Sequence, residues 1–191
     1  IIFSAITTIV LGGALSLANQ VLKPRQTRSV ELDTRRQILN AVIDLKGKKG
    51  NEVLELYKSS IEGIVIDING DIVETTASGD PAVAEEIDVA KNYKKAPENR
   101  LYPIFKFHEA GNPETVRAYI LPVYGKGLWG DIWGFVALDT DINTMKGASF
   151  DHASETPGLG ARITSSDVQQ RYGGKKIFND AGELRSVNML K

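Results

Sequence analysis

The chain has 191 residues, which suits one domain with an appendage, and a net charge of −1 with both signs mixed along it. It has no Cys and only two His, which excludes disulfides and thiolate-bound clusters and disfavours a His-rich metal site. Because the charge is balanced, there is no large basic field, and we expect no nucleic acid partner.

Residues 1–22 carry no charge, and basic residues follow from Lys23. A run of this length can cross a bilayer, which takes about 20 residues, so we predict a membrane anchor over 1–22 with the lipid bilayer as a partner. The run starts without an initiator Met, and we expect it to be truncated at its N-terminus. A cleaved signal peptide, with Ser16-x-Ala18 as the cleavage site, and a buried core helix are the alternatives. Small and hydroxyl side chains in the run also suit packing against partner helices.

The residues alone do not decide on which side of the membrane the domain after the anchor lies. The basic flank favours the cytoplasm by the positive-inside rule, but the rule compares two flanks, and long domains translocate regardless of charge.

After the anchor, apolar spacing predicts mainly helices. The first leads away from the membrane and is ended by Gly47, and the second has Asn51 as its N-cap. An Asn69-Gly70 turn between two β-branched runs predicts a hairpin. The predicted elements are helices over Gln26–Leu45 and Asn51–Ile61, hairpin strands over Ile64–Ile68 and Ile72–Thr76, and a short helix from Pro81 to Asn92.

The second half of the chain is dominated by predicted strands. They are followed by a short helix capped by Ser166 or Asp167, which ends at Tyr172, and by a last hairpin across Ala181-Gly182. The strands cover Tyr102–Glu109, Thr115–Tyr124, Ile132–Asp139 and Ile142–Phe150. Strands with segregated helices predict an α+β fold, with helices packed on an antiparallel sheet over residues 23–191.

The stretch "YGKGLWG" contains Gly125-x-Gly127-x-x-Gly130, the spelling of the dinucleotide fingerprint. That fingerprint needs a helix after the glycines, to hold the pyrophosphate at its N-terminus. Here "DIWGFVALD" follows and is typical of a strand, so we predict a hairpin across a Gly-rich turn and no NAD site.

The stretch "ETPGLG", Glu155 to Gly160, has neither helix nor strand periodicity. Its glycines free the backbone on either side of Leu159, so an apolar side chain there, with Thr156 nearby, could lie against a flat ring. An ordinary surface loop is the alternative, and the residues by themselves favour it.

Other candidate residues have weaker support. Asp139, Asp141 and Asp151 lie near His152 in sequence, but carboxylates at strand ends are more often turn formers than general bases. Trp129 and Trp133 could stack on a ligand, although packing in the core or at a membrane surface explains either one.

Taken in order, "YGKGLWG", "GFVALD", "ETPGLG" and "GKKIFNDAG" resemble the C subunit of the sodium-translocating NADH:quinone reductase. The N-terminal span followed by "LKPRQ" and "RRQILNA" fits as well, so the resemblance covers nearly the whole chain. "ETPGLG" is shared by the wider FMN-binding family, including the G subunit of the Rnf electron-transport complex, whereas "GKGLW" favours the sodium pump.

The resemblance implies a covalent FMN carrier in the bacterial inner membrane, with its soluble domain on the periplasmic side and the other membrane subunits of the pump as partners. Electrons received from NADH would pass toward ubiquinone through the assembled complex, and the subunit would not be catalytic alone. The implied ring contacts are Thr156 and Leu159, with backbone from Glu155, Gly158 and Gly160. The implied neighbouring wall consists of Gly127, Leu128 and Trp129.

The sequence departs from the family at the flavin attachment site. The family joins the FMN phosphate to a Thr in a Ser-Gly-Ala-Thr motif, which this sequence lacks. "GASF" does not match, and "GARITSS", which contains Thr164, lies too early in the chain. We therefore expect the attachment Thr beyond Lys191, and 23–191 to be an extracytoplasmic FMN-binding domain without its C-terminal segment. An Rnf-type carrier and a membrane-anchored sensor or binding domain without redox activity remain the alternatives.

Overall fold

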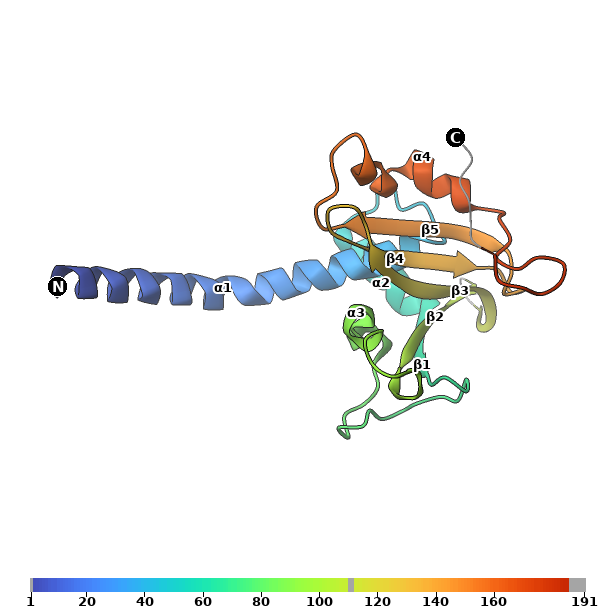
Figure 1. Ribbon diagram of the computed structural model, residues 1–191, viewed down its shortest axis with the longest axis horizontal. Coiled ribbons are helices and arrows are strands. Elements are labelled where there is room, and N and C mark those ends of the chain that lie inside the picture. The colour runs from blue at the N-terminus through green and yellow to red at the C-terminus, as the bar shows by residue number, and fades with distance from the viewer. Residues whose placement is uncertain (1, 110–111, 186–191) are drawn as a thin grey trace.

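The structure is a computed structural model that describes residues 2–109 and 112–185. A five-stranded antiparallel sheet, in the order β1-β2-β3-β4-β5, forms its centre, and helices pack on it (Figure 1). The predicted α+β fold is confirmed. The strands are β1 Ile61–Ile66, β2 Tyr102–Glu109, β3 Asn112–Lys126, β4 Asp131–Leu138 and β5 Met145–His152. The α-helices are α1 Ile2–Asn40, α2 Gly50–Ser60, α3 Val89–Asn92 and α4 Ser166–Gln169, and the 3₁₀ turns are Ala84–Glu86, Pro97–Asn99, Gly160–Thr164 and Gln170–Tyr172.

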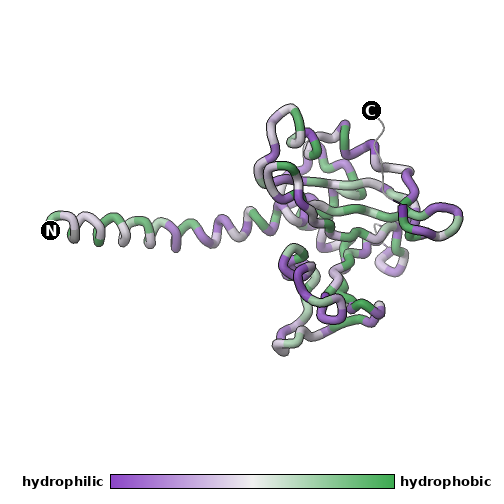
Figure 2. Tube along the Cα trace, in the orientation of Figure 1, coloured by the Kyte–Doolittle hydropathy of each residue, from purple (hydrophilic) through white to green (hydrophobic). Residues whose placement is uncertain are grey.

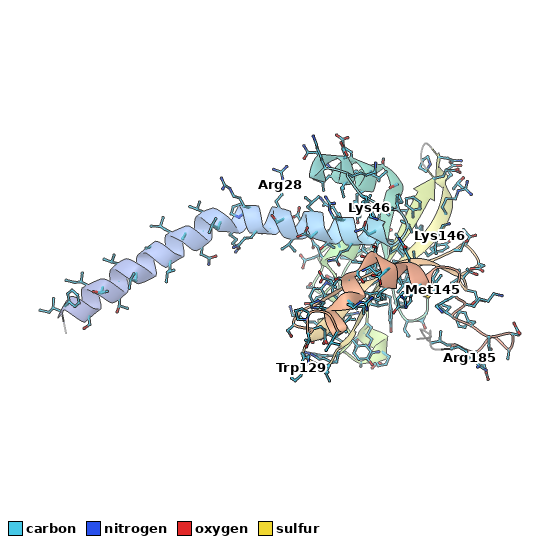
Figure 3. All side chains as sticks on the ribbon, turned by 90° about the horizontal axis from the view of Figure 1, so that it is seen from above. Arg28, Lys46, Trp129, Met145, Lys146 and Arg185 are labelled. Carbon is cyan, nitrogen blue, oxygen red and sulfur yellow. The ribbon has the colours of Figure 1, made fainter. Side chains whose placement is uncertain are left out.

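Helix α1 is one continuous element of 39 residues that leaves the domain on one side (Figure 1). By length and composition it could cross a membrane, and the apolar part of it lies far from the sheet (Figure 2). We expected a span and a second helix, but the structure joins them through Pro24. Proline removes one backbone hydrogen bond and bends a helix without always ending it, and Figure 3 shows the bend close to Arg28.

The end of α1 differs from the prediction and anchors the helix in the domain. It stops at Asn40 rather than Leu45, because the amides of Ala41 and Val42 bond to carbonyls three residues back, which tightens the last turn. Ile38 and Leu39 are fully buried. Leu45 is buried too, but it reaches the core from the loop after the helix.

One face of the sheet carries the main core. Phe105 and Phe135 meet there edge to face, 6.0 Å apart between ring centroids, under the buried side chains of α1 and α2. The opposite face carries a smaller cluster around Met145, where Phe150 of β5 packs on Tyr172 of the C-terminal segment at 5.2 Å. Strand β4 therefore contributes to both clusters, with Phe135 on one face and Val136 on the other.

Several predicted helical features are wrong in detail. Asn51 is not a cap, because α2 begins at Gly50, and the Glu52 carboxylate accepts the Lys49 amide just before it. The helix predicted from Pro81 to Asn92 is only a 3₁₀ turn and α3, because extended backbone at Ile87 interrupts it and Asp88 caps a new start.

The predicted hairpin after α2 is only partly formed. The chain does turn at Asn69-Gly70, but the returning arm makes one bridge, from Ile66 to Ile72, and is not a strand. The main partner of β1 is β2.

The four strands predicted from Tyr102 onward are confirmed, with shifted ends. Strand β5 starts at Met145 rather than Ile142, because Ile142 has φ 54°, in the left-handed region that a strand cannot use. The predicted helix after it is split into α4 and a 3₁₀ turn that ends at Tyr172. The last hairpin turns at Gly182 with a bridge from Phe178 to Leu184, and the rest of its second arm lies outside the described residues.

Candidate functional site

The Gly-rich turn "GKGLWG" joins β3 to β4 as a hairpin. The Gly127 amide donates to the Gly130 carbonyl at 2.7 Å, and β4 follows directly at Asp131. The predicted hairpin across the Gly-rich turn is confirmed, and β4 stands where the dinucleotide fingerprint requires a helix.

The stretch "ETPGLG" forms a tight turn directly after β5. The Thr156 carbonyl accepts the amides of Leu159 at 3.1 Å and of Ala161 at 3.2 Å. Pro157 and Gly158, which has φ 77°, occupy the two central positions, as in a type II turn. The turn is followed by the 3₁₀ turn from Gly160, so Leu159 is held at the junction of the two.

Side chains of the second loop tie the two loops together at the peptide groups of Trp129. The Trp129 amide donates to Glu155 Oε1 at 2.9 Å, and Ser154 Oγ donates to the Trp129 carbonyl at 2.8 Å. Glu155 is only 7% exposed. The sequence implies only a backbone role for Glu155 and gives Ser154 no role, since no spacing rule shows which side chain bridges two distant turns.

Two of the glycines are explained by the Glu155 carboxylate. A Cβ on Gly127 would lie 2.3 Å from Glu155 Oε1, and a Cβ on Gly160 would lie 2.4 Å from Oε2. Neither glycine has a positive φ. What they provide is space, so that a carboxylate fits between two backbones.

The tied loops present three large apolar side chains to solvent: Leu128 is 81% exposed, Trp129 67% and Leu159 74%. Both loops lie at the end of the sheet from which α1 leaves, and Trp129 marks that side of the domain (Figures 1 and 3). Isolated exposed apolar residues are ordinary, but these three stand on two loops that Glu155 and Ser154 tie together, and they are called the apolar patch below.

Helix α1 also contacts the base of these loops. Gln37 Nε2 donates to Asp151 Oδ2 at 3.2 Å, near the end of β5. One residue later, His152 Nδ1 accepts the Glu155 amide at 3.2 Å. His152 and Asp151 therefore have structural partners, and the loop starts from a fixed point next to the helix.

The charged groups beside the turn are paired. Lys126 and Asp131 form an ion pair across the start of the hairpin. The hydrogen bond between these two side chains raises the pKa of Lys126 and lowers the pKa of Asp131. Both groups stay charged near neutral pH, so this ion pair adds no net charge beside the apolar patch.

The other candidates do not join this site. Asp139 and Asp141 form the turn before β5, at the opposite end of that strand from Asp151, and the Thr144 hydroxyl lowers the pKa of Asp141 to about 2. They act as turn formers. Within residues 2–109 and 112–185, no group of three or more His, Cys, Asp or Glu could hold a metal ion.

The remaining singled-out residues have ordinary surroundings. Trp133 lines a mostly apolar hollow of about 360 Å³ between β3, β4 and the segment around α3. The Thr164 hydroxyl donates to the Ala161 carbonyl at 3.0 Å inside a 3₁₀ turn. Trp129 is thus the tryptophan that belongs to the tied loops.

Comparison with known proteins finds a match that includes both tied loops. The family of the FMN-binding domain matches residues 127–187, a range that begins at the Gly-rich turn and includes "ETPGLG". The C subunit of the Na(+)-translocating NADH-quinone reductase of Vibrio vulnificus (strain YJ016) is 33% identical over 180 residues, which cover 87% of this chain and 67% of that protein. Its counterpart in Haemophilus ducreyi is 33% identical over 196 residues, 96% of this chain and 72% of that protein.

The fold agrees with these sequence matches. The crystal structure of the C subunit from Parabacteroides distasonis ATCC 8503 superposes with a TM-score of 0.72 at 34% identity, covering 89% of this chain and 77% of that one. The resemblance carried by "YGKGLWG" and "ETPGLG" is thereby confirmed. The chain belongs to the family of the C subunit of the Na(+)-translocating NADH-quinone reductase.

Proposed function

We propose that this chain is the flavin-carrying subunit of a redox-driven sodium pump, and that it passes electrons received from NADH through partner subunits toward ubiquinone. The observation that carries the proposal is the pair of tied loops, which present an exposed apolar patch inside the region that matches the FMN-binding domain. Bound FMN supplies one-electron transfer, and the chain supplies the surface that holds and shields its ring.

The residues around the loops fit a flavin ring. Leu159 extends from a hydrogen-bonded turn and offers an apolar side chain to the face of a ring, and Leu128 and Trp129 stand on the adjoining loop. A Cβ on Gly158 would meet nothing within 4 Å, so the space beside the turn is open. The proposed FMN-binding set comprises Glu155, Thr156, Gly158, Leu159, Gly160, Gly127, Leu128 and Trp129.

The flavin attachment is proposed to be covalent. We place it at a Thr beyond Lys191, as a phosphoester, because the family motif for it is absent from the 191 residues. Thr164 is not proposed, since its hydroxyl already serves a local turn. Peptide mapping of the natural protein decides: a flavin-bearing peptide from beyond Lys191 supports this placement, and one that contains Thr164 overturns it.

The ring contact is tested with a matched pair of leucines. Leu159 and Leu184 are both 74% exposed, and only Leu159 belongs to the proposed set. In the natural, flavin-loaded protein, Leu159→Ala is expected to shift the midpoint potential and the visible spectrum of the flavin, whereas Leu184→Ala leaves both unchanged. Equal titration curves for the two variants would remove Leu159 from the site.

The membrane arrangement is also a proposal: residues 1–22 as anchor in the bacterial inner membrane, residues 23–191 in the periplasm, and other pump subunits as partners. Since the chain has no Cys, a single Ser78→Cys substitution in an exposed loop reports its side directly. A membrane-impermeant maleimide is expected to label this variant in cells whose outer membrane alone has been opened. Labelling only after the inner membrane is broken would contradict the orientation.

A further inference from the structure

The buried Glu155 carboxylate lies between the two loops and not in the patch itself. Its Oε1 accepts the Trp129 amide at 2.9 Å, and the two oxygens occupy the space left by Gly127 and Gly160. A carboxylate that is 7% exposed loses most of its contact with water, so it is retained only where it bonds something inside the protein.

The bond has a consequence for the side chains on the surface. The Trp129 peptide is held on both sides, by Glu155 at its amide and by Ser154 at its carbonyl. The side chains of Leu128 and Trp129 are more than half exposed and gain little orientation from packing. Their position relative to Leu159 therefore depends on these backbone bonds, because Glu155 stands at the start of the turn that carries Leu159.

We propose that Glu155 is a positioning residue, whose buried carboxylate clamps the Gly127–Gly130 turn onto the Glu155–Gly160 loop and so sets Leu128 and Trp129 beside Leu159. As regards FMN, this inference rests on the proposed function. As regards the geometry of the loops, it stands on its own, and Gly127 and Gly160 are the spacers that the clamp requires.

The first test measures hydrogen exchange at the Trp129 amide in the flavin-free chain, purified whole in detergent. The wild-type amide is expected to exchange much more slowly than an unstructured one. A hydrogen bond to a charged group corresponds to about 10- to 100-fold in exchange, so Glu155→Ala is expected to accelerate it by about that factor. Glu155→Gln retains an acceptor oxygen and is expected to stay within a few-fold, and Glu114→Gln, on an exposed part of β3, to change nothing.

A steric variant tests the same clamp with Glu155 still in place. Gly160→Ala places a Cβ 2.4 Å from Glu155 Oε2, and is expected to accelerate Trp129 exchange in the wild-type background. In the Glu155→Ala background the same change is expected to add little to Trp129 exchange, because the hydrogen bond that it would disturb is already gone. Additive effects of the two changes would overturn the clamp. An unprotected Trp129 amide in the wild-type chain would overturn it as well, and that measurement does not depend on the folding of any variant.

The flavin readout separates the clamp from the proposed function. In flavin-loaded natural protein, Glu155→Ala is expected to shift the flavin midpoint potential, and Glu155→Gln to retain more of the wild-type contact. If exchange at Trp129 responds and the potential does not, the clamp stands and the ring contact of the proposed function fails. If exchange does not respond, the clamp fails whatever the flavin does.

Discussion

Replacing Leu39 by Ala tests whether the docked end of α1 is part of the core of the domain. Leu39 is 0% exposed and packs in the main cluster with side chains of the sheet and α2. Truncating a buried leucine to alanine lowers the free energy of unfolding by about 2–5 kcal/mol. The variant loses the burial of the removed carbon atoms, and the cavity left behind costs further energy. For a domain of this size, a loss of about 3 kcal/mol lowers the melting temperature by about 6–12 °C.

The assay must report the domain and not the exposed apolar part of α1. Near-ultraviolet circular dichroism of the whole chain in detergent follows the packed aromatic side chains, such as Phe105 and Phe135, whereas the far-ultraviolet signal is dominated by helix that detergent protects. Leu128→Ala is the matched control, because it makes the same change at a side chain that is 81% exposed. Its effect on stability is expected to stay within about 0.5 kcal/mol. If the two variants melt together, α1 does not dock as described.

Three further changes test other parts of the fold. Gly134→Ala is expected to lower the free energy of unfolding by about 3 kcal/mol or more, because its Cβ would lie 2.1 Å from a carbonyl oxygen of β5. Gly125→Ala is the control, because its Cβ would meet nothing within 4 Å, and it is expected to unfold near the wild-type midpoint in urea. Asp141 has a folded-state pKa of about 2 against 3.8 for the free group, so it stabilises the fold above pH 3.8, and this contribution is lost as the pH falls from 3.8 through 2. Asp141→Asn is expected to melt lower at pH 7, with the gap to wild type closing across that window in a pH series. Tyr57→Phe removes a 2.7 Å hydrogen bond to Glu85 and is expected to cost about 1 kcal/mol in the same denaturation assay, so an unchanged midpoint would refute that bond.

The sheet was more predictable than the helices for a physical reason. Short runs rich in β-branched and aromatic side chains, such as Ile132, Trp133 and Phe135 in β4, indicate a strand because such side chains suit the pleated surface of a sheet. Helix ends depend instead on which backbone groups find partners. The Lys49 amide bonds to Glu52, and Asp88 starts a new turn inside a predicted helix. Both bonds span only three residues, and helix propensity alone does not show which of several nearby polar side chains forms the cap.

The candidate site was predictable as two stretches, but not as one surface. "GKGLWG" and "ETPGLG" stand out through their glycines, and the absence of a helix after Gly130 could be foreseen from the strand pattern. The role of the Glu155 side chain could not, because it bonds a residue 26 positions earlier in the chain. A buried carboxylate between two glycines is a property of three-dimensional packing, and sequence spacing carries no signal for it.

The continuity of α1 fixes the distance between the proposed membrane anchor and the domain. From residue 22 to the buried Ile38 the helix extends about 24 Å at 1.5 Å per residue, so its length sets the height of the tied loops above the proposed anchor. One inserted residue would raise the domain by about 1.5 Å and rotate it by about 100° around the helix axis. Seven inserted residues, close to two full turns, would change the height and nearly restore the direction. In the proposed arrangement, the length of α1 therefore also sets the direction in which the apolar patch faces.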